Sequence, residues 1–155
     1  MKLSFGKALA AEIGLVALLL LGYFSADIYA AFKRENISYT PALECELNQK
    51  SCAVALKDGS ILEVSMEPKI VLPLQKAEFR VKNIGAKEVK AVIRGLNMEM
   101  GVHEYKFQKE GDGTFRAAVS LPSCSIDMKW QVDVFVLKNS GEYGGGFITW
   151  SKNQL

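Results

Sequence analysis

Two short stretches of the chain, GLNMEMGVHEY and LPSCSIDMKW, carry sulfur and imidazole side chains that could bind a metal. The candidate ligands are Met98, Met100, His103, Cys124 and Met128. Thioethers and thiolates are soft ligands that select Cu(I), and imidazole also suits copper. A thioether carries no proton to lose and forms no disulfide, so it remains a ligand outside the cytoplasm. These residue types predict a Cu(I) site, provided that the two stretches meet in the fold.

The spacing of the methionines suggests how the ligands would be presented. In an extended strand, residues two apart point to the same side. Met98 and Met100 would therefore place both sulfurs on one face of a strand, and Gly101 would permit a turn that brings His103 round to them. Cys124 and Met128 would lie in a loop between two strands. We expect the five donors to converge at one end of the domain, where function often resides in such folds.

A structural interpretation of the same residues stays open. Met98 and Met100 could form the inward face of a strand, since methionine readily fills irregular gaps in a core. A single cysteine such as Cys124 is more often a small buried hydrophobe than a ligand. In that case the domain would be a non-catalytic interaction module.

Catalytic and nucleic-acid functions find little support. The run HEYKF resembles the start of a zinc-protease helix but lacks its second histidine. One histidine and no serine in a nucleophile-elbow turn leave no catalytic triad. The run GEYGGG is better interpreted as a flexible turn than as a phosphate-binding loop. The net charge is +2 and no stripe of Lys and Arg is present, so we expect neither an enzyme nor a nucleic-acid partner.

The N-terminal residues predict export to a membrane. Residues 8–32 are nearly free of polar side chains, and a helix over residues 7–32 would reach about 39 Å at ~1.5 Å per residue. Because the hydrocarbon core is about 30 Å thick, we expect residues 1–32 to form a single transmembrane anchor. A signal segment cleaved after Ala30 is the alternative. Residues 33–44 contain Pro41 and no periodicity, so they are expected to be a linker.

Cys45 and Cys52 are separated by six residues in the stretch CELNQKSC and flank a polar turn. That spacing suits a short disulfide loop in an oxidising compartment. The pairing would leave Cys124 as the one unbridged cysteine, which keeps a thiol redox partner as a further option.

From Cys45 onward the pattern changes to short alternating runs with turn signals between them. CAVALK and ILEVSME flank DGS and predict a hairpin, and HEYKFQKEGDGTFRAAVSLP predicts a second hairpin around GDG. In MKWQVDVFVLKN, one face is formed by Trp130, Val132, Val134 and Val136. About seven short strands without helical periodicity predict an all-β fold, an immunoglobulin-like antiparallel β-sandwich over residues 45–155.

The ordered motifs resemble a known family. GLNMEMG, followed by GDGTFRAAVSLPSCSIDMKWQVDV, is similar to the YtkA-like and FixH-like exported domains, which carry an MxMG strand, an LP hairpin arm and a closing M.W strand. The matching positions are Met98, Met100, Gly101, Gly113, Phe115, Leu121, Pro122, Met128 and Trp130. The resemblance implies an immunoglobulin-like sandwich tethered by one N-terminal helix, associated with copper handling and cytochrome oxidase assembly.

Together these observations predict a single-pass protein of the bacterial inner membrane whose C-terminal domain lies in the periplasm. It would bind Cu(I) and assist copper delivery to, or assembly of, a respiratory cytochrome oxidase. A respiratory oxidase or another copper chaperone is the expected partner. The alternative is an interaction module that docks on a membrane complex and uses its methionines as core.

Overall fold

The structure is a computed structural model that describes residues 14–20, 22–25, 37–73, 75–123 and 126–153. The chain divides into two compact units, residues 1–36 and 37–155. In the first unit, residues 14–20 and 22–25 are helical, and the rest of the expected anchor lies outside the described residues. Within the part of the chain that is described, no helix has the length and apolarity needed to span a membrane.

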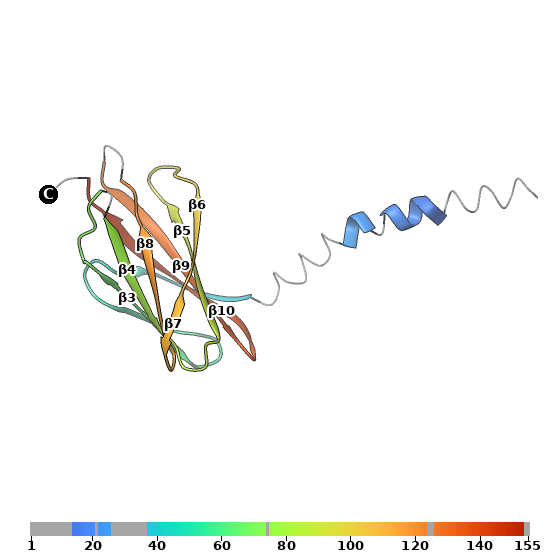
Figure 1. The fold of residues 1–155 in the computed structure, drawn as a ribbon, viewed down its shortest axis with the longest axis horizontal. Helices are drawn as coiled ribbons and strands as arrows, with labels where there is room; N and C mark the ends of the chain where they lie inside the picture. The colour runs from blue at the N-terminus through green and yellow to red at the C-terminus, as the bar shows by residue number, and fades with distance from the viewer. Residues whose placement is uncertain (1–13, 21, 26–36, 74, 124–125, 154–155) are drawn as a thin grey trace, which may run out of the picture. The chain divides into compact units, whose positions relative to one another are not determined.

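Over its described residues, the second unit is an all-β sandwich of ten strands in two five-stranded sheets (Figure 1). The strands are β1 (Ile37–Glu46), β2 (Cys52–Ala55), β3 (Ile61–Glu67), β4 (Lys76–Lys82), β5 (Glu88–Gly95), β6 (Val102–Lys106), β7 (Gln108–Gly111), β8 (Thr114–Ser120), β9 (Met128–Lys138) and β10 (Gly141–Ser151). The first sheet has the order β1-β10-β9-β5-β6 and the second β2-β3-β4-β8-β7. All described pairings within the sheets are antiparallel except β1 with β10, which is parallel.

The sandwich begins earlier than the sequence suggested. Residues 37–44, expected to belong to a linker, form most of β1, which pairs with β10 from Ile37 opposite Glu142 to Pro41 opposite Gly146. Residues 33–36 of that expected linker lie outside the described residues. Strand β1 shows no apolar–polar alternation, and residues 37–40 are half-buried on both faces of the strand. Its pairing partner lies about a hundred residues away in sequence, so no nearby turn signalled it. The linker prediction is therefore wrong from Ile37 onward.

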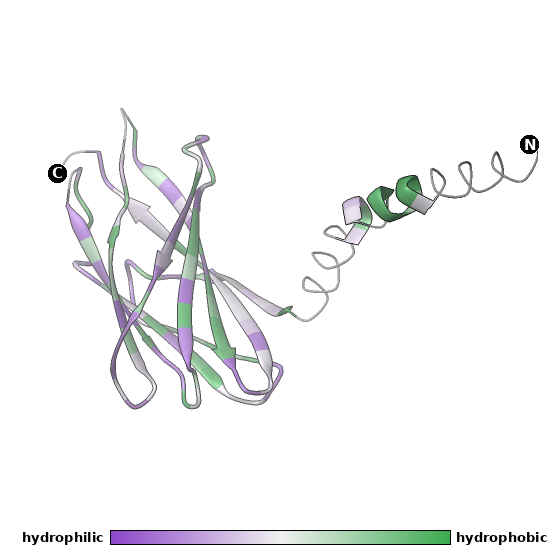
Figure 2. Cartoon of the chain, turned by 45° about the vertical axis from the view of Figure 1, so that its right-hand side comes forward, coloured by the Kyte–Doolittle hydropathy of each residue, from purple (hydrophilic) through white to green (hydrophobic). Residues whose placement is uncertain are grey.

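The core lies between the two sheets and follows the predicted alternation. In β9, the face formed by Trp130, Val132, Val134 and Val136 is fully buried, as predicted. The second sheet contributes an apolar face of the same kind, made up of Leu62, Val64, Met66, Phe79, Val81, Phe115 and Val119. Figure 2 shows apolar and polar residues alternating along several of these strands.

One predicted hairpin is confirmed and the other is divided between the sheets. Strands β2 and β3 pair around Asp58–Ser60, where Gly59 adopts a positive φ of 80° that favours glycine. The stretch expected to form one long arm, residues 103–111, changes sheets at Phe107, so β6 pairs with β5 and β7 with β8. Phe107 is 9% exposed. Its burial favours the sheet change over a continuous arm.

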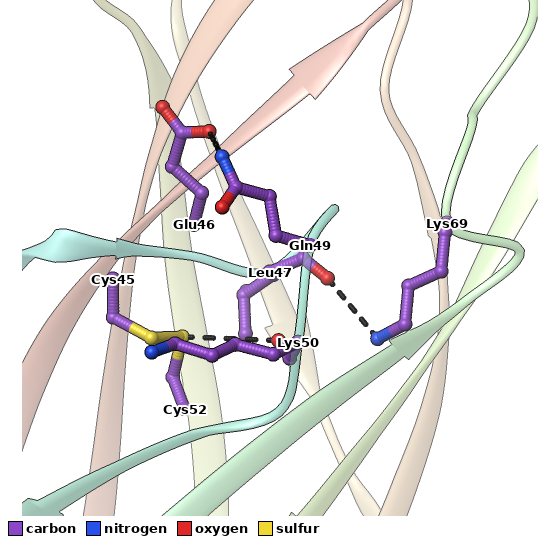
Figure 3. The surroundings of a disulfide bond; sticks show 7 residues. All are labelled: Cys45, Glu46, Leu47, Gln49, Lys50, Cys52 and Lys69. Carbon is purple, nitrogen blue, oxygen red and sulfur yellow. Dashed lines mark hydrogen bonds between the residues drawn. A yellow bond between two sulfur atoms is a disulfide. The ribbon is translucent and has the colours of Figure 1, made fainter.

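The predicted disulfide is present and joins the two sheets (Figure 3). Cys45 lies near the end of β1 in the first sheet, and Cys52 begins β2 in the second. Beside it, the Lys69 ammonium donates to the Leu47 carbonyl at 3.1 Å. The disulfide closes the β1–β2 loop, and the lysine holds that loop against the chain that follows β3.

Candidate metal centre at the methionine end

Met98 and Met100 lie in the loop between β5 and β6, which corrects the expectation that they occupy a strand. Strand β5 ends at Gly95 because the chain folds back over it: a Cβ atom at Gly95 would lie 2.3 Å from the Met98 carbonyl oxygen. Gly101, with φ at 75°, then directs the chain into β6. The two thioethers are thus presented by a loop rather than by the face of a strand.

This loop is fastened to the second candidate stretch, as the metal-site hypothesis required. The Asn97 side chain donates from Nδ2 to the Asp127 carbonyl at 2.9 Å, and its Oδ1 accepts the Lys129 amide at 2.9 Å. The Leu96 amide also donates to the Lys129 carbonyl at 2.8 Å. The loop with Met98 and the stretch around Asp127 therefore meet at one end of the sandwich, which we call the methionine end (described residues 96–101, 121–123, 126–128 and 151–153).

The C-terminal residues close the methionine end. The Asp127 carboxylate accepts the Lys152 ammonium at 2.7 Å and the Asn153 amide at 2.9 Å. The hydrogen bond from Lys152, followed by that from the Asn153 amide, lowers the pKa of Asp127. Ser123 donates from Oγ to the Lys152 carbonyl at 3.1 Å. Cys124, a predicted ligand, lies outside the described residues.

His103 is oriented by the same loop. Its Nε2 lies 3.0 Å from the Met100 carbonyl oxygen. A carbonyl can only accept a hydrogen bond, so Nε2 carries the proton in this contact and Nδ1 keeps its lone pair in the neutral ring. The half-buried imidazole meets the fully buried Trp130 ring edge-on, with a centroid distance of 6.5 Å.

The three described methionines of the site differ in burial. Met98 and Met100 are half-buried and pack against the core. Met128 is fully buried at the start of β9. Its terminal methyl lies beneath the loop, 3.3 Å from the position of a Cβ atom at Gly95. Met128 is therefore part of the core that supports the site.

Three of the predicted donors belong to the β5–β6 loop and the start of β6. Met98, Met100 and His103 offer two neutral thioethers and an imidazole Nδ1, and such donors suit Cu(I). Among the described residues, no group of three or more His, Cys, Asp or Glu side chains is placed to hold a metal. The chemistry of this end thus rests on the methionines and the histidine.

Sequence reasoning missed a second cluster, the Asp133 cluster, which lies on the outward face of the first sheet. Asp133 is 4% exposed. Its carboxylate accepts Tyr39 Oη at 2.5 Å, Arg94 at 2.7 Å and Gln131 Nε2 at 2.8 Å. Burial, together with the hydrogen bond to Asp133, raises the pKa of Tyr39 to about 12. The aspartate is thus fully satisfied and joins β1, β5 and β9.

Glycines in β10 make the Asp133 cluster possible. Tyr39 reaches from β1 across β10, where a Cβ atom at Gly146 would lie 2.0 Å from the Tyr39 hydroxyl and one at Gly144 3.1 Å from its ring. The interpretation of GEYGGG as a flexible turn is wrong, since these glycines lie within β10. Three successive glycines inside an apolar strand were the signal for such a close approach.

Comparisons with known proteins add little to this description. No protein-family model matches the chain, and no curated protein matches it. A solved structure of a DUF4785 family protein from Legionella pneumophila aligns with a TM-score of 0.46 and 14% sequence identity. The alignment covers 62% of this chain but only 29% of that protein.

Proposed function

We propose that this protein binds Cu(I) at the methionine end of its sandwich and hands copper to a respiratory cytochrome oxidase or to another copper chaperone. Met98, Met100 and His103 would be the principal ligands, with Cys124 and Met128 completing the set. When bound, Cu(I) would be the cargo that the domain carries. The protein's own part is to keep soft donors together on a rigid frame.

The contact between His103 and the Met100 carbonyl carries this proposal. Metal-binding histidines nearly always donate their second ring N–H to a carbonyl, carboxylate or water, which fixes the tautomer that coordinates. Here that acceptor belongs to Met100, itself a candidate ligand, at 3.0 Å from Nε2. The loop therefore holds the imidazole beside the backbone of a second candidate ligand.

The proposed location and fold class rest on different features. The Cys45–Cys52 disulfide is typical of exported proteins, and the apolar N-terminal residues favour a single-span anchor in the bacterial inner membrane with the sandwich in the periplasm. An immunoglobulin-like classification is supported by the connections β4–β5, β6–β7 and β8–β9, each of which passes between the sheets. The YtkA-like and FixH-like motifs support the link to oxidase assembly.

A Cu(I) titration tests the proposal. The purified full chain should compete with a chromogenic Cu(I) chelator and retain about one ion per chain. Replacing both loop methionines, Met98→Leu with Met100→Leu, removes the thioethers but keeps apolar side chains of similar volume, so copper retention should be lost while the fold persists. The matched control is Met66→Leu in the buried core, which should retain copper. Equal retention by the loop variant and the control would contradict the proposal.

The packing of the methionines supports a second candidate, a non-catalytic module that docks on a membrane complex. Met98 and Met100 contact the core, and Met128 is wholly buried. Thermal unfolding with and without Cu(I) separates the two functions, because a ligand that binds only the folded state raises Tm. A rise in Tm that the Met98→Leu, Met100→Leu variant lacks supports copper binding. An unchanged Tm in the parent protein supports the module.

A further inference from the structure

Strand β7 pairs with only part of its neighbour β8, so the edge of the second sheet is open beside the rest of β8. Strand β7 pairs with β8 only from Gln108 opposite Arg116 to Gly111 opposite Thr114. On its other side, β8 pairs with β4 along its whole length, to Ser120 opposite Lys76 (Figure 1). Among the described residues, no strand pairs with residues 117–120 on the β7 side. A notch therefore remains in the edge of the sheet.

Backbone polar groups point into this notch. Tyr105 of β6 donates from Oη to the Ser120 carbonyl at 3.1 Å, so the polar groups of Ser120 face the β7 side. Residues two apart in a strand direct their N–H and C=O groups the same way. Ala118 therefore presents both backbone groups to the notch, and its side chain is exposed. Such unpaired groups are a template for another strand.

The notch opens into a groove of about 470 Å³ that carries positive charge. Its walls include Tyr105, Lys106, Lys109, Glu110, Arg116 and Ala118. Lys106 and Lys109 are exposed, and neither forms an ion pair with any described residue. Arg116 is already paired with Glu110 at 3.0 Å and with Glu78. Two uncompensated ammonium groups thus flank backbone groups that can extend a sheet.

We propose that this groove binds an extended acidic segment of a partner protein, which adds to β8 as a short strand. The partner's backbone would pair with Ala118, and its carboxylates would lie against Lys106 and Lys109. The small side chains of Ala117 and Ala118 leave room for the incoming chain. When a peptide adds to a sheet as a strand, main-chain hydrogen bonds provide the affinity, and every second side chain of the peptide provides the specificity. Tyr105 limits the site, because its hydroxyl already occupies the Ser120 carbonyl.

The first test uses the acetylated and amidated peptide Glu-Val-Glu-Val-Glu and the full-length protein in detergent micelles. Amide hydrogen exchange should slow at Ala118 when the peptide is added. The same peptide methylated on its central backbone nitrogen should bind at least about tenfold more weakly, because strand pairing needs that N–H. Equal binding of the methylated peptide, protection elsewhere on the protein, or no binding would overturn the proposal.

Three variants test the role of individual side chains. Lys106→Glu with Lys109→Glu should weaken binding of the acidic peptide by roughly tenfold or more, whereas the control Lys57→Glu with Lys87→Glu changes exposed lysines away from the groove and should not. Tyr105→Phe frees the Ser120 carbonyl and should tighten binding. A second copy of this chain is the alternative occupant of the groove, and size-exclusion chromatography over a range of protein concentrations tests for it. A dimer that the Lys106→Glu, Lys109→Glu variant cannot form would show that a second copy fills the groove, and would overturn the proposal.

Discussion

The two ends of the sandwich are closed by opposite kinds of chemistry. At the end away from the methionines, the Lys138 ammonium bridges the sheets, 2.8 Å from Asp58 Oδ2 and 2.7 Å from Ser60 Oγ. Asn83, 2% exposed, donates to the Ile61 carbonyl at 2.9 Å beside them. We call this the lysine end. The methionine end instead carries the half-buried Met98 and Met100, and the His103 ring that follows them lies edge-on to Trp130.

The two ends differ in how much charge they bury. The Lys138 and Asp58 side chains are only 8% and 16% exposed, so removal of either one would leave the other charge largely buried and unpaired. The candidate donors of the methionine end are neutral side chains, and rearranging them would separate no ion pair.

The largest expected loss of stability is at Met128, and measuring it tests how far the core extends into the methionine end. Met128→Ala should lower the free energy of unfolding by about 2–5 kcal/mol, because the side chain is fully buried. Met128→Leu keeps most of the volume and should cost less than about 1.5 kcal/mol. Urea unfolding followed by tryptophan fluorescence measures both values. If Met128→Ala lost less unfolding free energy than Met128→Leu, the side chain would not be packed at this end as described.

At the lysine end, Lys138→Met should lower the free energy of unfolding by about 1–3 kcal/mol, because it leaves Asp58 without its partner. Copper retention should not change, since the substitution lies at the far end of β9. The control is Lys57→Met at an exposed neighbouring position, which should be nearly neutral. A loss of copper by Lys138→Met would mean that the two ends are coupled.

Acid should weaken the lysine end in a defined pH range. Burial opposes ionisation of Asp58, but hydrogen bonds from Lys138 and Ser60 outweigh it and lower its pKa to about 2. Since the unfolded chain has an aspartate pKa near 3.9, the stabilisation is complete above about pH 4 and is lost as the pH falls toward 2. Unfolding midpoints measured from pH 5 to pH 2 should fall less steeply in Asp58→Asn. Parallel pH profiles for the two proteins would refute this assignment.

The smallest expected effect is at Asn97, which fastens the methionine loop. Asn97→Ala removes two hydrogen bonds, to the Asp127 carbonyl and from the Lys129 amide. The side chain is exposed, so the cost in unfolding free energy should be about 0.5–1.5 kcal/mol. Hydrogen exchange at the Lys129 amide should accelerate, and Cu(I) affinity should fall because the donors are less well oriented. Unchanged exchange would show that the loop does not depend on this clamp.

Local patterns in the sequence predicted the parts of the fold that depend on neighbours in the chain. The alternation from Trp130 to Val136 gave the buried face of β9, and the turn at Asp58–Ser60 gave the β2–β3 hairpin. The spacing of Cys45 and Cys52 gave the disulfide. Each of these features lies within a few residues of the signal that predicts it.

Features that depend on distant partners were missed. The parallel pairing of β1 with β10 and the ion pair of Lys138 with Asp58 join residues 80 or more positions apart. Met98 and Met100 were placed in a strand because alternation cannot show that the chain reverses over Gly95. The Asp133 cluster forms because Gly144 and Gly146 leave room for Tyr39, a contact between distant parts of the sequence.

The parallel pairing of β1 with β10 has a mechanical consequence. Any tension on the chain ahead of Ile37 enters the sandwich through β1, the first strand. Because β1 runs parallel to β10 over Ile37 to Pro41, its hydrogen bonds are loaded in shear and share the force, instead of opening one after another. The Tyr39 contact with Asp133 and the Cys45–Cys52 disulfide resist the same displacement. The domain is thus built to withstand a pull at its entry strand.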